Sequence, residues 1–240
     1  MHKDFDHSKF ESEVKELKNI FYLSKPPEEN PSEFGLPHQE SDRIVALRRK
    51  FSDKEYNTLI QQAQGVDRKD IISAAILLYG AMSIMERDGD HVASLEMLTA
   101  ALQVMNELPK ENQSIEYWTR LWVNITVQYA IDFHALTGDT YTANAILQAA
   151  IKRATDAMMG NWSAWTTLAE FEVMDSREKG VDERTINIRL NQILTDLKNR
   201  HPKFHEDRDL HLYLMSQYCF DEYRKTPMYR ALLGKLIDTK

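Results

Sequence analysis

Apolar residues recur along most of the chain at the three- and four-residue spacing that places them on one face of an α-helix. No stretch of useful length alternates apolar and polar residues as a strand does. The pattern therefore predicts an all-α protein. After an amphipathic N-terminal segment, helices are expected at about 40–51, 52–65, 68–87, 91–107, 114–136, 140–159, 162–176, 183–200, 208–224 and 228–238.

Prolines divide the chain into parts. Four of the seven lie between Lys25 and Pro37, in a segment that cannot continue a helix and has few apolar residues. We therefore expect an N-terminal helical arm (1–24), a Pro-rich linker (25–40) and a helical body (41–240). The arm carries an apolar stripe, which consists of Phe10, Val14, Leu17 and Phe21. This stripe either docks on the body or binds a partner.

Two stretches of the body repeat each other. "GDHVASLEMLTAAL" begins at Gly89, and "GDTYTANAILQAAI" begins forty-nine residues later at Gly138. A glycine can take the left-handed turn that ends one helix, and an aspartate can cap the next. The paired alanines that follow allow the second helix to approach a neighbour closely, with Ala101 and Ala150 expected at the contact. The repeat predicts stacked helical hairpins.

The small and large residues after each glycine resemble the second helix of the tetratricopeptide (TPR) repeat. The second copy matches fully with Ala143, Leu147 and Ala150, and a third candidate copy begins in "WTTLA" at Trp165. That third copy needs extra residues, which we place in "SREKGVD". The period is longer than the usual ~34 residues, and the first helices of the two clear copies lack the family's Trp and Gly. The resemblance covers about residues 70–202 and implies an α-solenoid; HEAT-like and other helical repeats stay open.

In a TPR protein the first helix of each hairpin lines a concave groove. The resemblance therefore implies nine partner-binding positions: Tyr79, Ser83, Arg87, Gln128, Tyr129, Asp132, Thr166, Thr167 and Glu170. This set is polar, aromatic and slightly acidic, and it lacks the Lys and Asn pattern with which TPR co-chaperones clamp a C-terminal carboxylate. We expect an adaptor, scaffold or chaperone whose partner is a basic or amphipathic segment of another protein. A homo-oligomer stays open.

Composition narrows the kinds of partner and the cellular location that we expect for this protein. A net charge of −7 argues against nucleic acid as the partner. The single cysteine, Cys219, fits a reducing compartment. The longest apolar stretch, Ile71 to Met85, is shorter than the roughly 20 residues of a membrane-spanning helix. The first residues lack the apolar run of a secretory signal. We therefore expect a cytoplasmic protein without a membrane partner.

The common signatures of phosphate, dinucleotide, zinc and acyl-transfer sites are absent from the sequence. We therefore expect no enzymatic activity, no cofactor and no metal. Two alternatives stay open. One is a metal-dependent enzyme that uses the cluster His201, His205, Asp207, Asp209 and His211. The other is a regulator that contacts nucleic acid through Arg48, Arg49 and Lys50.

Overall fold

The computed structural model describes residues 36–67, 70–113, 116–157 and 162–233. The N-terminal arm and almost all of the linker lie outside these residues. Every regular element in the described part is a helix, which confirms the all-α class. The elements are α2 (His38–Ser52), α3 (Tyr56–Gln64), α4 (Ile71–Asp88), α5 (His91–Glu107), α6 (Lys110–Gln113), α7 (Glu116–Thr137), α8 (Thr140–Asp156), α9 (Ser163–Glu178), α10 (Glu183–Arg200), α11 (Arg208–Ser216), η2 (Tyr218–Phe220), α12 (Asp221–Arg224) and α13 (Pro227–Leu233). None of the described helices combines the length and apolar character that crossing a bilayer requires.

Three helical hairpins share one kind of turn. Gly89, Gly138 and Gly180 take φ of 65°, 67° and 70°, which is the left-handed region that side chains rarely adopt. No atom lies within 4 Å of where a Cβ would stand on any of them, so backbone conformation rather than space calls for glycine. The first two turns were predicted. The third joins α9 to α10 inside "SREKGVD", so the expected insertion is itself a hairpin turn.

An aspartate caps the second helix of each hairpin. Asp90 accepts hydrogen bonds from the backbone N–H groups of Val92 and Ala93 at 3.1 and 3.0 Å. Asp139 and Asp182 accept from Thr142 and Thr185 in the same way, each at 3.0 Å. These bonds satisfy donors that a helix start leaves without partners. The Gly-Asp motif therefore acts as predicted, because both of its parts work through local backbone geometry.

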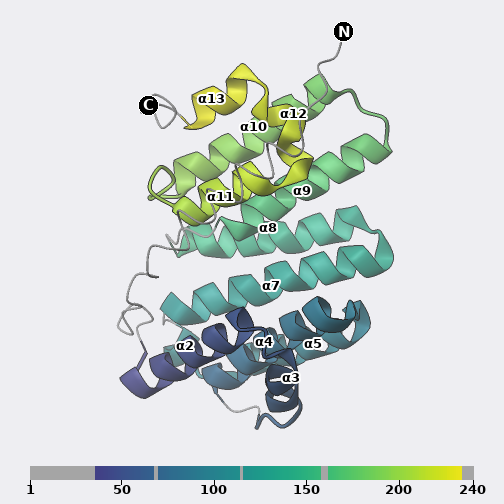
Figure 1. Cartoon of the computed structure of the whole chain (residues 1–240). Coiled ribbons are helices and arrows are strands. Elements are labelled where there is room, and N and C mark those ends of the chain that lie inside the picture. The colour runs from purple at the N-terminus through teal and green to yellow at the C-terminus, as the bar shows by residue number, and fades with distance from the viewer. Residues whose placement is uncertain (1–35, 68–69, 114–115, 158–161, 234–240) are drawn as a thin grey trace.

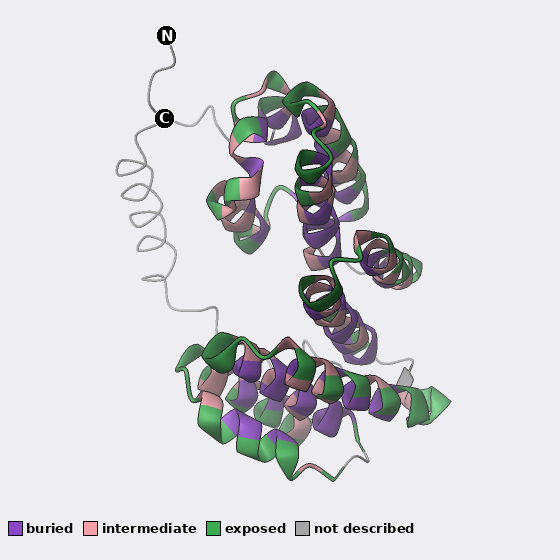
Figure 2. Ribbon diagram, turned by 90° about the vertical axis from the view of Figure 1, so that its right-hand side faces the viewer, coloured by how far each residue is buried: buried purple, intermediate pink, exposed green. Residues whose placement is uncertain are grey.

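The hairpins stack in chain order. Helix α4 packs on α5, α5 on α7, α7 on α8, α8 on α9 and α9 on α10, while α2 and α3 pack against α4. Figure 1 shows this stack from bottom to top, with the three glycine turns along the right-hand edge. Turned by 90°, the described chain has the outline of a C, because α2 and α3 at one end and α11 to α13 at the other project to the same side (Figure 2). Helix α7 lies at the middle of the inner wall.

Two clusters of buried apolar side chains meet at α7. Trp118, Leu121 and Ile125 belong to the cluster shared with α4 and α5. Val123 and Val127 face the other cluster, which continues through α8, α9 and α10 into the C-terminal helices. The small residues Ala101 and Ala150 are fully buried, as the repeat predicts. The opposite sides of α7 thus hold the two halves of the molecule together.

Some predicted boundaries are wrong. We read Ser52 as a helix start, but α2 continues through Ser52, Lys54 takes a positive φ of 61°, and α3 begins at Tyr56. The single helix expected over 208–224 is three short ones, because α11 ends at Ser216 and a 3-10 turn follows. Helix α13 begins at Pro227, one residue before the expected start, and the Thr226 hydroxyl accepts from the Tyr229 N–H at 3.2 Å.

Candidate partner-binding surface

Neighbouring helices cover most sides of α7. The Trp118 indole donates to the Met105 carbonyl of α5 at 3.3 Å. Arg153 of α8 places its guanidinium 4.1 Å from the centre of the Trp118 ring. The His134 ring stacks on Phe171 of α9, with 4.4 Å between centroids. The packing of α4 against α7 covers a fourth side.

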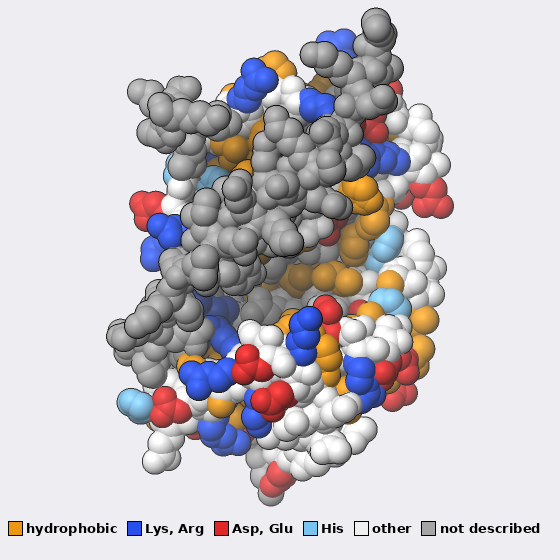
Figure 3. All heavy atoms as spheres, viewed as in Figure 1, with side chains coloured by type: hydrophobic (Ala, Val, Ile, Leu, Met, Phe, Trp, Pro, Cys, Tyr) orange, Lys and Arg blue, Asp and Glu red, His pale blue; other side chains and the backbone are white. Residues whose placement is uncertain are grey.

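The remaining side of α7 faces the hollow of the C. It carries four residues at helical spacing, of which Asn124 is exposed and the others are partly exposed: Arg120, Asn124, Gln128 and Ile131. We call this set the inner stripe. Figure 3 looks into the hollow, where hydrophobic side chains lie at the level of α7 and charged ones lie on the helices below and above.

The inner stripe combines a cation, two amides and an apolar side chain. The Arg120 guanidinium pairs with Glu116 one turn earlier at 2.7 Å, and both groups are accessible to solvent. The Gln128 amide lies 3.3 Å from both carboxylate oxygens of Asp132, which leaves its carbonyl oxygen as an acceptor. Side-chain amides carry donors and acceptors together, so they can pair with the polar groups of a peptide backbone. The inner stripe is therefore suited to hold a polypeptide segment.

Only one of the three groove residues predicted on α7 belongs to the inner stripe, namely Gln128. Tyr129 instead packs against the apolar cluster of α4 and α5. Asp132 is fully buried, where it accepts from His91 Nδ1 at 3.0 Å and from the Ser94 hydroxyl at 2.6 Å. The prediction is corrected for these two side chains, because they point toward the preceding hairpin rather than into the hollow.

On α4 the predicted groove residues also have structural roles. The Tyr79 ring packs against Phe51 of α2 with 5.9 Å between centroids. Ser83 is fully buried and donates to the Tyr79 carbonyl at 2.7 Å. Arg87 lies exposed at the end of the helix and pairs with Asp88. The prediction of an accessible groove position is therefore wrong for Ser83.

On α9 the predicted positions lie beneath the C-terminal helices or inside the core. Thr166 and Thr167 are buried, so neither can contact a partner in this conformation. The Tyr213 hydroxyl of α11 donates to the Glu170 carboxylate, and the Tyr213 ring also contacts Trp162. The nine predicted residues therefore do not form one continuous open groove, because α11 and η2 cover the third hairpin.

Burial governs the ionisable groups under α11. It raises the pKa of Glu170, and the hydrogen bond from Tyr213 acts in the opposite direction. Burial also raises the pKa of Tyr213, with the carboxylate of Glu170 adding to the effect. Burial and then Glu170 raise the pKa of Cys219 to about 12. The Cys219 thiol therefore stays protonated at neutral pH, which is unlike a reactive cysteine.

Asp132, His91 and Ser94 are residue types that also form catalytic triads. In a triad the serine hydroxyl bonds to the imidazole, and the carboxylate orients that imidazole from its other side. Here Ser94 and His91 both bond to the carboxylate of Asp132. The cluster joins the first turn of α5 to α7, so its geometry is that of a structural contact between hairpins.

The candidate metal cluster is spread along the turn between α10 and α11. His201 Nε2 lies 2.9 Å from Asp207, whose other oxygen caps α11, and His211 Nε2 lies 2.7 Å from the Phe204 carbonyl. His205 is exposed beside the Phe204 ring. Within residues 36–67, 70–113, 116–157 and 162–233, no three His, Cys, Asp or Glu side chains converge as metal ligands would.

The basic cluster on α2 is also accounted for by local contacts. Burial and then Tyr79 raise the pKa of Tyr117, and the positive charge of Arg48 acts in the opposite direction. Arg49 and Lys50 occupy the last turn of α2, where positive charge is favourable to the helix dipole. These positions support a structural role for the cluster.

Two hollows lie beside α8 on the outer layer. A cavity of about 490 Å³ lies by Trp122, Lys152 and Arg153, and burial lowers the pKa of Arg153 there. A second of about 440 Å³ is lined by α8, α9 and α10, and Lys152, Asp156, Asp196 and Arg200 give it mixed charge. Neither presents the converging groups of a single sign that would select a small charged ligand.

Comparison of the chain with family models, with curated proteins and with solved structures finds no match. The candidate surface is therefore defined by the geometry of α7 and its neighbours alone.

Proposed function

We propose that the chain is a TPR-like α-solenoid that acts as an interaction module and holds a segment of another protein along the inner stripe of α7. The observation that carries the proposal is the position of this stripe. It lies at the middle of the inner wall, with its side chains at least partly exposed, and the two ends of the described chain project beside it. A curved stack of hairpins offers the extended concave surface that repeat proteins use for binding.

The chemistry of the inner stripe indicates the kind of segment. Asn124 is exposed on this side, and one helical turn later the Gln128 carbonyl oxygen is left as an acceptor, which suits an N–H group of an extended or irregular peptide backbone. Ile131, one turn beyond Gln128, adds only the exposed part of its side chain, because the rest packs against the apolar cluster that continues into α8, α9 and α10. Because the four stripe residues include no carboxylate, an amphipathic segment fits better than a purely basic one. A role as adaptor, scaffold or chaperone follows from such binding.

A paired substitution tests this proposal. Asn124→Arg adds a long charged side chain to the inner stripe, and Gln148→Arg makes a similar change on the exposed face of α8. The purified variants serve as bait against an extract of the native source, with mass spectrometry of the retained proteins. We expect a partner retained by the wild type and by Gln148→Arg to be lost with Asn124→Arg. Thermal melts of both variants must match the wild type for the comparison to hold.

The N-terminal arm provides a second comparison. If its apolar stripe competes for the inner face, removal of residues 1–35 will increase the amount of partner retained. If the arm has no such role, the truncated chain will retain as much partner as the full chain does, and the amount retained will still depend on Asn124. Equal retention by wild type, Asn124→Arg and Gln148→Arg would contradict the proposed binding face.

A further inference from the structure

The most exposed large apolar side chains gather near the glycine turns. In the part of the chain that the structure describes, six such side chains stand out, and Tyr141 is the most accessible at 86%. Five of them lie within eight residues of Gly89, Gly138 or Gly180: Val92, Leu136, Tyr141, Met174 and Ile188. We call these five the turn-edge ridge. The sixth, Tyr218, lies in η2, away from the three turns.

The repeat places the ridge residues on one edge. Val92 and Tyr141 each stand three residues after a turn glycine, so they hold equivalent positions on α5 and α8. Leu136 lies one helical turn beyond Asp132, which binds His91 next to Val92. Met174 precedes Gly180 by six residues, as Asp132 precedes Gly138, but the Met174 side chain is 44% exposed whereas Asp132 is fully buried. With Ile188 eight residues after Gly180, each of the three hairpins thus carries at least one exposed apolar side chain near its turn.

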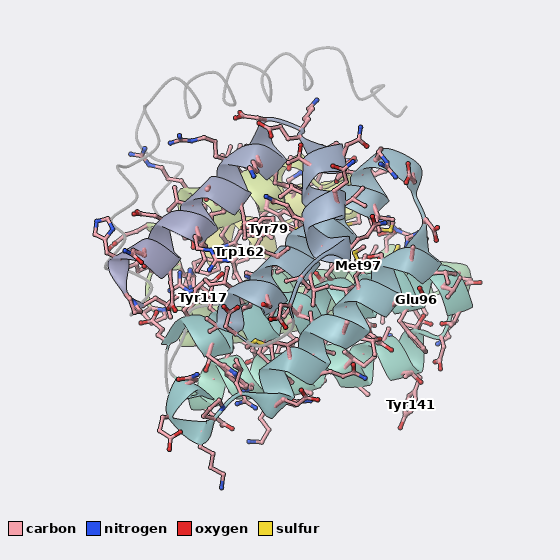
Figure 4. The ribbon with its side chains drawn as sticks, turned by 90° about the horizontal axis from the view of Figure 1, so that it is seen from below. Tyr79, Glu96, Met97, Tyr117, Tyr141 and Trp162 are labelled. Atoms are coloured by element: carbon pink, nitrogen blue, oxygen red, sulfur yellow. The ribbon has the colours of Figure 1, made fainter. Side chains whose placement is uncertain are left out.

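The views agree with this arrangement. The three turns lie along one side of the stack in Figure 1. Seen from below, Tyr141 of α8 and Glu96 of α5 project from the same corner of the molecule, away from the body (Figure 4). Tyr141 therefore lies on the side of the stack where the glycine turns are, whereas the inner stripe faces the hollow of the C.

The segments that carry the turn-edge ridge are rich in acidic side chains. Residues 86–96, 136–145 and 174–188 contain nine acidic and four basic side chains. Three of the four basic ones are already paired with carboxylates, in Arg87–Asp88, Arg177–Glu183 and Lys179–Asp175. Hydrogen bonds from Thr142 and Thr185 lower the pKa of the capping Asp139 and Asp182, so both stay ionised at neutral pH.

We propose that the turn-edge ridge binds a basic amphipathic helix of a partner protein. The apolar side chains would receive the apolar face of that helix, and the acidic borders complement Lys and Arg beside it. Neighbouring helices pack about 8–10 Å apart, so the ridge from α5 through α8 to α10 is on the order of 20 Å or more. At 1.5 Å per residue, this corresponds to a helix of at least about 13 residues.

A synthetic peptide is a suitable probe. We would use a fluorescein-labelled peptide of eighteen residues that contains only Leu and Lys, with Leu at the i, i+3, i+4 and i+7 spacing of one helical face. The same residues in scrambled order, and a version with Glu in place of Lys, serve as controls. Fluorescence anisotropy with the full chain should show binding of the Leu/Lys helix, at least fivefold weaker binding of the scrambled peptide, and none of the Leu/Glu peptide.

Variants locate the site. Tyr141→Ser and Ile188→Ser remove exposed apolar surface from the ridge, and we expect each to weaken binding at least fivefold. The matched control is Tyr218→Ser, which removes an exposed tyrosine elsewhere and should leave the affinity within twofold of the wild type. Because all three side chains are largely exposed, the variants should fold as the wild type does.

Crosslinking separates this proposal from the proposed function. A photoreactive group on the Leu/Lys peptide should label residues 88–96, 136–145 or 174–188. Labelling at residues 120–131 would instead assign the peptide to the inner stripe and overturn the turn-edge site. Equal loss of affinity with Tyr141→Ser and Tyr218→Ser would also overturn it. Self-association of the chain would also overturn it if Tyr141→Ser abolished that self-association, because the ridge would then bind a second copy.

Discussion

The packing around Gly80 allows a quantitative prediction for the start of the hairpin stack. Gly80 lies in the middle of α4, where α3 and α5 both approach it. A Cβ on this residue would stand 2.4 Å from the Cβ of Ala63 and 3.2 Å from the sulfur of Met97. Carbon atoms in contact prefer about 3.5–4.0 Å. Gly80→Ala therefore forces α3 away from α4 by roughly an ångström, because neither Cβ can rotate out of the way.

Two opposing contributions set the size of the effect. Alanine in a helix interior is about 0.8–1 kcal/mol more favourable than glycine. Overpacking of a close contact destabilises by about 1–3 kcal/mol, and a distance of 2.4 Å between two fixed Cβ atoms favours the upper end. We expect a net destabilisation of about 1–2 kcal/mol. For a domain of this size, that lowers Tm by about 2–8 °C.

The assay is thermal and urea unfolding of Gly80→Ala, Ala63→Gly and the double variant. Ala63→Gly restores the missing space, so the double variant should be at least about 1 kcal/mol more stable than the sum of the single changes predicts. Gly65→Ala is the control, because the nearest atom to its Cβ would lie at an ordinary 3.7 Å. A stabilising Gly80→Ala, or additive effects of Gly80→Ala and Ala63→Gly, would refute the reasoning.

Further predictions concern the repeat register, the polar contact between hairpins and the cysteine. Ala150 is fully buried and Gln148 is exposed. Thermal melts should therefore show that Ala150→Leu destabilises the fold by about 1–3 kcal/mol and that Gln148→Leu changes its stability little. If Gln148→Leu were the more destabilising of the two, the predicted register would be wrong. Asp132→Ala leaves three buried or half-buried donors, on His91, Ser94 and Gln128, without their acceptor, and urea unfolding should show a loss of about 1–3 kcal/mol. An unchanged midpoint would mean that water replaces the carboxylate. Cys219 has a pKa raised to about 12, so its alkylation by iodoacetamide should be slow at pH 7 and still accelerating at pH 10. A plateau near pH 9 in the folded protein would contradict the burial of this thiol.

The hairpins could be predicted from sequence because their signals are local. A glycine at positive φ and an aspartate that caps the following N–H groups depend on a few adjacent residues. Gly180 and Asp182 carry the same signal with one residue inserted between them. A pattern of two adjacent residues does not detect this third turn, because the glycine and the aspartate of the first two copies have no residue between them. A search for Gly followed by Asp at either spacing would have found the third turn.

The binding face could not be predicted in the same way. The groove positions were transferred from the TPR pattern, and that transfer fixes neither the rotation of α7 nor what covers its neighbours. Tyr129 and Gln128 are adjacent in sequence, yet one packs on a core and the other faces the hollow. The cover over Glu170 comes from Tyr213, which is 43 residues away along the chain. Such contacts depend on how distant helices pack, which periodicity alone does not specify.

Site-specific photo-crosslinking from the inner stripe tests the central claim most directly. A photoreactive amino acid at position 124 places the probe in the hollow, and the same residue at position 148 places it on the outer face of α8. After irradiation in an extract of the native source, we expect a discrete protein partner joined to position 124 and absent from position 148. Crosslinks from position 124 to residues 8–25 of the chain itself would show that the arm occupies the face. The same products from both positions, or none from position 124, would contradict the account of α7 as the binding wall.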